Sequence, residues 1–192
     1  MNENNIVIDN GGGYIKAGFS GYEGPSDVIP TCIGHSKFGN WWAGKKEFFG
    51  YEARAKSYAL NFNYPIEHGV IKNLDDMEKI WEDLFTNQLK VNPKMHDVMI
   101  TDSEMNPKVN KEKIAQIMFE TFKAPALFIP NSCILALYSA GKYNGIVVDS
   151  GDGVTQCVPV FDGFSIKQAI IHLDLGGRDL TEYMEKLLEE IG

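Results

Sequence analysis

The sequence has little of what several classes of protein require. Its three cysteines, Cys32, Cys133 and Cys157, form no C-x-x-C pair and accompany no cluster of histidines, so neither a disulfide framework nor a zinc site is predicted. No run of Lys or Arg occurs, and the net charge of -8 lacks the basic field of a nucleic-acid surface. The longest apolar stretches, PALFIP and CILALY, are far shorter than the ~20 residues that cross a bilayer.

The remaining composition is that of an ordinary folded domain. The chain has 192 residues, of which 44% are hydrophobic and 23% charged, and a chain of this length buries about 70% of its unfolded surface. The N-terminal MNENN has the features of neither a signal nor a transit peptide. We therefore expect a soluble, intracellular protein that inserts into no membrane and binds no nucleic acid.

Strand-like and helix-like patterns alternate along the chain, which predicts an α/β fold. Asn73 is a candidate N-cap for an amphipathic helix that ends at Asn92-Pro93. A last helix carries an apolar stripe from Leu180 to Ile191, which needs a cover. The predicted strands lie within 5–33 and at 97–101, 126–130, 145–149, 154–161 and 164–173, and the other helices at 110–122 and 132–141.

One pattern occurs twice. DNGGGYIKA (9–17) follows the apolar run NIVI, and DSGDGVTQC (149–157) follows GIVV, so that Asp9 and Asp149 stand 140 residues apart. A tight glycine turn lets backbone N–H groups converge on an anion, which suits a polyphosphate. A pair of carboxylates beside phosphates invites a hydrated Mg²⁺, and Lys16 could reach a phosphate oxygen. A single copy could equally be a plain β-turn; the duplication favours phosphate binding.

Five longer segments resemble the actin family, in order and spacing. They are DNGGGYIKAGFSG, YPIEHGVIKNLDDMEKIW, MNPKVNKEKIAQIMFETF, GIVVDSGDGVTQCVPVFDGF and LDLGGRDLTEYM, and together they span roughly the first half of an actin-family polypeptide. The resemblance implies an actin-like ATPase (ribonuclease-H-like) α/β fold with ATP or ADP and Mg²⁺ in a cleft between two similar domains. Residues 1–140 would form the first domain, with an inserted subdomain at about 31–66 that carries an aromatic loop. Residues 141–192 would begin the second domain, which is incomplete.

The resemblance also assigns site residues. Asp9 and Asp149 would hold the metal through water, and Gly177 would lie beside the nucleoside. Arg178 and Asp179 would either assist there or simply begin a solvated helix. The residues that would line the phosphates are Asp9, Asn10, Gly11, Gly12, Gly13, Tyr14 and Lys16 in the first loop, and Ser150, Gly151, Asp152, Gly153 and Val154 in the second.

Three positions depart from the family pattern. Actins arrange the attacking water with a glutamine and a histidine, and this chain has Ser132 and Gln156 there. Gly12 replaces a serine of the first turn and so removes one hydroxyl donor. Losing an oriented polar group in such a site costs ~10²–10³ in rate. We therefore expect slow or absent ATPase activity, although Gln156 could still bind a water.

Two further features point to protein partners. Trp41 and Trp42 lie in the aromatic loop at 34–50, where actin has the loop that inserts into the next subunit of a filament. Tyr138 to Gly141 resembles part of the groove that accepts such a loop. Alternatively, the aromatic residues pack locally.

By the resemblance, the chain would end one helix into the second domain, and we expect the apolar stripe and an unfinished sheet to be uncovered and any phosphate binding to be weak. A divided gene and a truncated chain both explain this ending.

Two functions follow from the resemblance. The first is a scaffold subunit of a larger cytoskeletal or multi-subunit assembly with a vestigial cleft, whose partners are protein subunits such as actin or a second polypeptide that completes the fold. The second is an ATP-binding protein that polymerises or joins actin filaments. Either would be cytoplasmic and associated with the cytoskeleton.

Overall fold

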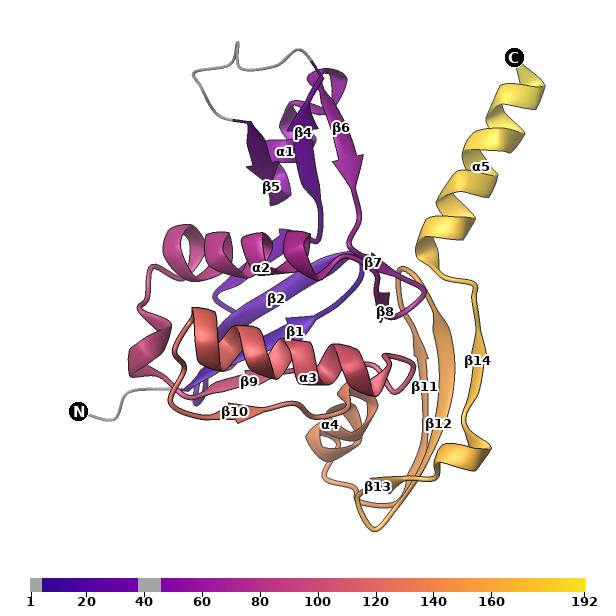
Figure 1. The fold of residues 1–192 in the computed structure, drawn as a ribbon. Helices are drawn as coiled ribbons and strands as arrows, with labels where there is room; N and C mark the ends of the chain where they lie inside the picture. Colours follow the sequence, from indigo (N-terminus) through magenta and orange to yellow (C-terminus); the bar gives the residue numbers. More distant parts are fainter. Residues whose placement is uncertain (1–4, 38–45) are drawn as a thin grey trace.

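A computed structural model describes residues 5–37 and 46–192 (Figure 1). Its centre is a five-stranded sheet with the order β10-β9-β1-β2-β3. The hairpin β1–β2 and the pair β2–β3 are antiparallel, whereas β9 pairs with β1, and β10 with β9, in parallel. The strands are β1 (Ile6–Asn10), β2 (Tyr14–Phe19), β3 (Asp27–Pro30), β9 (Val98–Ile100) and β10 (Leu127–Phe128).

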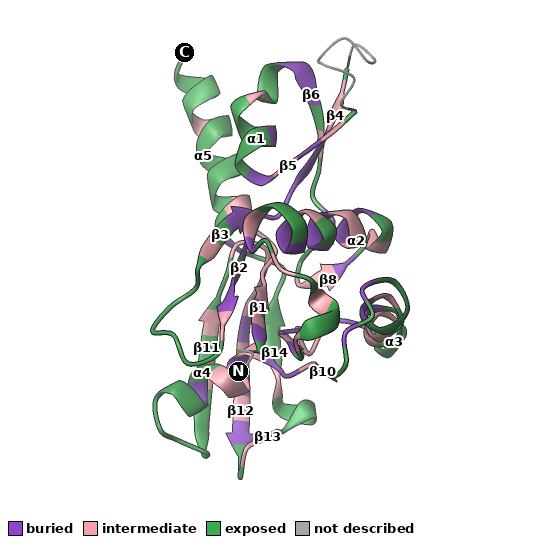
Figure 2. Ribbon diagram, turned by 90° about the vertical axis from the view of Figure 1, so that its left-hand side faces the viewer, coloured by how far each residue is buried: buried purple, intermediate pink, exposed green. Residues whose placement is uncertain are grey.

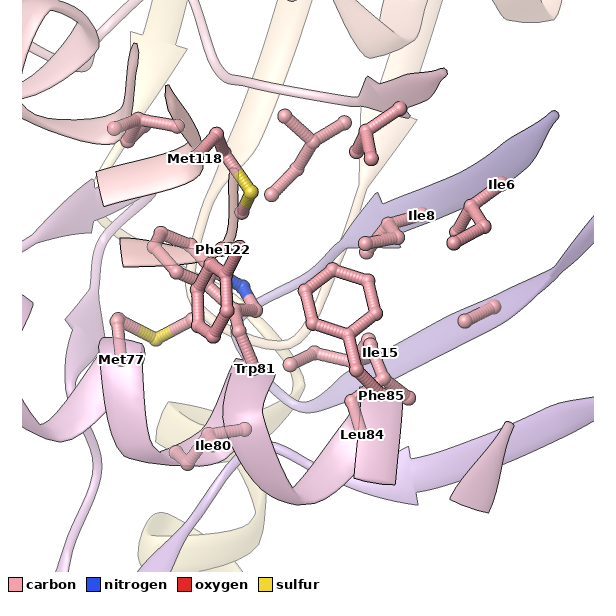
Figure 3. Close-up of a cluster of buried hydrophobic side chains, with 14 of the residues drawn as sticks. Ile6, Ile8, Ile15, Met77, Ile80, Trp81, Leu84, Phe85, Met118 and Phe122 are labelled. Atoms are coloured by element: carbon pink, nitrogen blue, oxygen red, sulfur yellow. The ribbon is translucent and has the colours of Figure 1, made fainter. Parts of the chain in front are cut away.

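Two helices cover one face of this sheet. They are α2 (Leu74–Asp83) and α3 (Lys108–Gln116), and each continues into a π-helical turn, Leu84–Gln88 and Ile117–Thr121 respectively. The Asn73 side chain accepts a hydrogen bond from the Asp76 N–H, so the predicted N-cap of α2 is confirmed. Period-2 alternation in β1 turns Ile6 and Ile8 toward the helices. Figure 3 shows these side chains meeting Trp81 and Phe85 of the first helix and Met118 and Phe122 of the second in one buried cluster.

A small second sheet stands apart above the first (Figure 1). It has the order β5-β4-β6 and its own core of Cys32, Phe48, Ala53 and Leu60. A hairpin, β7–β8, then leads into α2. The elements are β4 (Ile33–Ser36), β5 (Glu47–Phe49), α1 (Gly50–Ala55), β6 (Leu60–Asn63), β7 (Ile66–Glu67) and β8 (Val70–Ile71). Trp41 and Trp42 lie outside the described residues.

The second copy of the hairpin builds a third sheet, β11-β12-β13, with β14 also paired to β12. Like β1–β2–β3, the run β11–β12–β14 is an antiparallel meander. Its inner face packs on α4 through Cys133, Leu137, Val158 and Val160. The elements are α4 (Ser132–Ser139), β11 (Gly145–Ser150), β12 (Thr155–Phe161), β13 (Phe164–Ser165), β14 (Ile171–Leu173) and the final helix α5 (Gly177–Ile191).

The prediction of one strand over 164–173 is wrong, because a 3₁₀ turn at Lys167–Ala169 divides it into β13 and β14. Pro159 of β12 explains the break. Ile166 N–H donates to the Pro159 carbonyl at 2.9 Å, but proline has no N–H to return, so the ladder cannot continue there. The chain leaves the sheet and rejoins β12 at Ile171, opposite Cys157.

Two apolar surfaces are uncovered in the part of the chain that the structure describes. No residue of α5 is buried, and the helix extends away from the sheets (Figures 1 and 2). The outer face of the third sheet, opposite α4, is also exposed. Its apolar side chains are Ile146, Val148, Ile171 and Leu173, which we call the outer face.

Candidate functional site

A cavity of about 570 Å³ lies between the two glycine turns. One wall is the first loop, Gly11 to Gly13, between β1 and β2, and the other is the second loop, Gly151 to Val154, between β11 and β12. The structure therefore brings the two sequence copies to one shared space. Both predicted metal carboxylates, Asp9 and Asp149, line it.

The first loop is held from outside the cavity. Thr31 donates its hydroxyl to the Gly11 carbonyl at 2.7 Å and its N–H to the Gly13 carbonyl at 3.0 Å. The indole N–H of Trp81 donates to Asn10 Oδ1 at 3.2 Å. None of these contacts uses a backbone N–H group of the loop, and over residues 5–37 and 46–192 no bond engages the N–H groups of Gly12 and Gly13.

The second loop is a tight turn. Gly151 N–H donates to the Val154 carbonyl at 2.9 Å, and His68 Nδ1 donates to the Gly153 carbonyl at 2.8 Å. As in the first loop, no described residue accepts from the N–H groups of Asp152 and Gly153. The two turns also touch each other, since a Cβ placed on Gly13 would lie 2.7 Å from the Cβ of Asp152. A side chain at that position would push the loops apart.

The two carboxylates have corresponding positions and different partners. Asp9 pairs across the hairpin with Lys16, and Asp149 with Gln156. Lys16 Nζ lies 2.8 Å from Asp9 Oδ2, and the Thr101 hydroxyl donates to Asp9 Oδ1 at 2.9 Å. Gln156 Nε2 donates to Asp149 Oδ2 at 3.2 Å. Within the described chain no three His, Cys, Asp or Glu side chains form a direct metal-ligand set, so a cation at this place would rely on water for most of its ligands.

Ser132 and Gln156 both line the cavity. Gln156 is only 3% exposed, and its Oε1 is buried without a hydrogen-bond partner among the described residues. Next to Ser132, the Cys133 thiol lies 4.0 Å from Asp149 Oδ2. Burial, together with the Asp149 charge, raises the pKa of Cys133 to about 11, so this thiol stays protonated at neutral pH.

These residues fit a polyphosphate with a hydrated divalent cation. Four N–H groups at the two turns have no partner within the described part of the chain, two carboxylates line the same cavity, and the Gln156 Oε1 has no donor there either. Unpaired N–H groups around a cavity are what an anion requires. Of the predicted phosphate residues, those that line the cavity are Asp9, Asn10, Gly11, Gly12, Gly13, Tyr14, Lys16, Gly151, Asp152, Gly153 and Val154.

Ser150 and Gly177 do not line the cavity. The Ser150 hydroxyl is 2.9 Å from that of Thr155, and Gly177 N–H donates to the Gly151 carbonyl at 2.9 Å. Asp179 caps its own helix by accepting from Gly176 N–H at 2.7 Å. The Arg178 side chain instead contacts both loops.

Sequence reasoning missed the residues that hold the loops. The contacts of these residues span 20, 71 and 92 positions of sequence for Thr31, Trp81 and Thr101 respectively. No local sequence pattern predicts such long-range contacts. Arg178 had one available signal. Arginine occurs only twice in the chain, at Arg54 and Arg178. Each guanidinium stacks on a tyrosine ring, Tyr14 and Tyr64 respectively, and Tyr14 lines the cavity.

Of the predicted partner residues, Tyr138 and Gly141 do not line this cavity. The Tyr138 hydroxyl donates to the Gly163 carbonyl at 3.3 Å, and its ring packs against Tyr143 with centroids 5.4 Å apart. Gly141 follows α4 with φ of +69° and has no neighbour within 4 Å of its Cβ position. Tyr138 is nevertheless 42% exposed, which leaves it accessible to another molecule.

The fold and this cleft define an α/β protein in which a repeated hairpin supplies two facing glycine loops. The family model described as Actin matches residues 1–191. The chain therefore belongs to the actin family, and its fold is the actin-like α/β fold. None of the helices that the structure describes is long and apolar enough to cross a membrane.

Proposed function

We propose that this actin-family chain is a structural subunit of a larger protein assembly, cytoskeletal in character, and that its phosphate cleft binds Mg-ATP or Mg-ADP only weakly. The exposed apolar surface carries this proposal. On the outer face, Val148 is 71% exposed and Ile171 66%, and they lie in one row with Cys157 between them. Such contiguous apolar surface is typical of a protein interface.

The final helix gives the same indication. Leu188 is 60% exposed and Ile191 82%, on a helix with one strongly apolar side. An isolated helix of this length is marginal in water, so α5 gains most of its stability from whatever covers that side. Removing apolar surface from water contributes ~25 cal/mol of stabilisation per Å². Covering this side of α5 therefore favours a permanent partner over a transient one.

In such a subunit, bound nucleotide would mainly stabilise the arrangement of the two loops around the cleft. The N–H groups of Gly12, Gly13, Asp152 and Gly153 would hold phosphate oxygens, and Asp9 and Asp149 would hold the hydrated cation. The cation would neutralise phosphate charge. Hydrolysis would be slow, because Ser132 is too short to place a water and the amide of Gln156 is already engaged with Asp149.

The alternative is an ATP-binding protein that polymerises or joins actin filaments. The observation in its favour is the cleft itself, because both loops and both carboxylates line one cavity. A switch of that kind needs nucleotide occupancy and filament contacts, whereas a subunit needs neither.

The deciding experiment is native mass spectrometry of the tagged full chain, isolated from cells under mild conditions, with extraction of any bound nucleotide. A stoichiometric complex with other polypeptides supports the subunit. A lone chain or a homopolymer with one ATP or ADP per copy overturns it in favour of the switch.

Variants locate the interface. Val148→Lys with Ile171→Lys on the outer face should release the chain from its complex. Val109→Lys on α3 is the matched control, because Val109 is similarly exposed, at 58%, and lies outside both apolar surfaces. Equal loss of the complex in both would contradict this placement of the interface.

A further inference from the structure

Arg178, the second residue of α5, contacts parts of the chain that are far apart in sequence. Its Nη2 donates to the Gly12 carbonyl of the first loop at 3.2 Å and to Asp152 Oδ2 of the second loop at 2.7 Å. Its guanidinium carbon lies 4.3 Å from the centroid of the Tyr64 ring, between β6 and β7. One side chain thus joins both glycine loops and the segment that leaves the small sheet.

The backbone on either side of Arg178 is fixed to the second loop. Gly177 N–H donates to the Gly151 carbonyl at 2.9 Å, and Arg178 N–H to the Asp152 carbonyl at 2.8 Å. Any Cβ on Gly176 would overlap the Asp152 carbonyl oxygen. The start of α5 and the second loop therefore move as one unit, and the Arg178 side chain extends from that unit to the first loop.

The contact between Arg178 and Asp152 also neutralises a negative charge in the second loop. Asp152 belongs to a loop whose free N–H groups suit an anion, yet its carboxylate would repel one. Arg178 neutralises this carboxylate within a partly buried pair, since the two side chains are 25% and 34% exposed. A planar guanidinium can bind a carboxylate and a carbonyl while it stacks on a ring, and an ammonium cannot do all three.

We propose that Arg178 is the positioning residue that ties the two loops together and sets the width of the cleft. Removing it would let the second loop move away from the first and would leave the Asp152 charge unpaired at the place where phosphate enters. The part of this proposal that concerns phosphate affinity rests on the proposed function; the tie between the loops does not.

Residue-resolved amide hydrogen exchange on the full chain without ligand tests the tie. The informative amide is Thr31, which donates to Gly13 of the first loop and lies far from α5 in sequence. In Arg178→Ala its exchange should rise about 10-fold, and in Arg178→Lys by less, since a hydrogen bond to a charged group commonly contributes a factor of that order. A role confined to the start of α5 would change only the amides of residues 176–180, and an unchanged Thr31 in both variants would overturn the proposal. Lys186→Ala, which removes a cation from the exposed part of the same helix, should leave Thr31 as it is.

Titration with Mg-tripolyphosphate, followed by calorimetry, tests the consequence for binding. We expect Arg178→Ala to weaken binding about 10- to 100-fold, and Arg178→Lys to fall between that variant and wild type. Equal affinity in all three would remove the positioning role. If wild type itself binds no tripolyphosphate, the phosphate cleft fails as a function, and the exchange at Thr31 alone decides whether Arg178 ties the loops.

Discussion

Gln156 donates its side-chain amide to Asp149, in the same cross-strand position from which Lys16 pairs with Asp9. The repeated hairpin thus holds both carboxylates in place, one through an ammonium and the other through a neutral amide. This difference leaves the Asp149 side of the cleft more negative than the Asp9 side. It also fixes Gln156 as a partner of the carboxylate and leaves only its Oε1 for a water.

The first prediction concerns hydrolysis. Ser132→Gln combined with Gln156→His introduces a longer amide side chain and an imidazole into the cavity wall, where both positions lie. Phosphate release at saturating Mg-ATP should rise ~10²-fold, because an oriented polar group in a phosphoryl-transfer site commonly contributes this much. A colorimetric phosphate assay on the purified chain measures it. Wild-type release as fast as that of the double variant would contradict our view of the site.

The second prediction concerns pH. Burial raises the pKa of the Asp102 carboxyl, against the opposing effects of the Asn106 hydrogen bond and the Lys111 charge. Lys111 Nζ is 3.6 Å from Asp102 Oδ2, too far for a hydrogen bond. The folded state therefore holds this proton more tightly than the unfolded state, so the contribution of Asp102 to stability falls as pH rises from the ordinary carboxyl range through the raised pKa.

Asp102→Asn removes that dependence. Its free energy of unfolding should increase relative to that of wild type as pH rises from 4 to 7, measured by urea denaturation at each pH, because only wild type loses the Asp102 contribution. Asp174→Asn changes an exposed carboxyl in the same way and serves as the matched control. A constant difference between Asp102→Asn and wild type across this range would show that burial does not govern the carboxyl.

The third prediction concerns the cysteines. Burial raises the pKa of Cys32 as well as that of Cys133, whereas Cys157 lies half-buried in the outer face. With a pKa of about 11, Cys133 is ionised to only ~0.1% at pH 8. Iodoacetamide at pH 8 should therefore modify Cys157 first, as peptide mass spectrometry would detect. Unfolding the protein in guanidinium chloride should abolish this order of cysteine modification. If Cys133 of the native protein reacted as fast as Cys157, the prediction would be contradicted.

The sequence predicted the cleft because its signal is local and repeated. Asp9 and Asp149 each lie near the end of a strand, just before a glycine turn. The turns, Gly11 to Gly13 and Gly151 to Gly153, are short, so their own residues determine the backbone conformation. Asn73 was predictable for the same reason, because a cap acts three residues away. Family resemblance then supplied the expectation that the two turns face each other.

The features that the sequence did not predict depend on packing between segments that are distant in sequence. Whether Arg178 would meet a nucleoside or solvent was left open, and it meets Gly12, 166 positions earlier in the chain. The break at Ile166 depended on which strand would lie beside Pro159. Neither outcome follows from propensity, since both are set by the partner that tertiary structure provides.

The last prediction concerns α5. Its fifteen residues include none that is buried, so in the lone chain its backbone hydrogen bonds are supported by the helix itself and by the contacts of residues 176–178 alone. Amides from Tyr183 to Ile191 should exchange at least 100-fold faster than those of β1, whose Ile6 and Ile8 are fully buried, because local opening is cheap where few apolar contacts are lost. Leu188→Lys should not change this rate in the lone chain but should weaken its complex, since the substituted side chain lies on the uncovered apolar side. Hydrogen exchange of the lone chain and of the isolated complex, measured side by side, separates the two states: protection of Tyr183 to Ile191 that appears only in the complex identifies α5 as covered by a partner. Slow exchange there in the lone chain would instead mean that this helix is already packed.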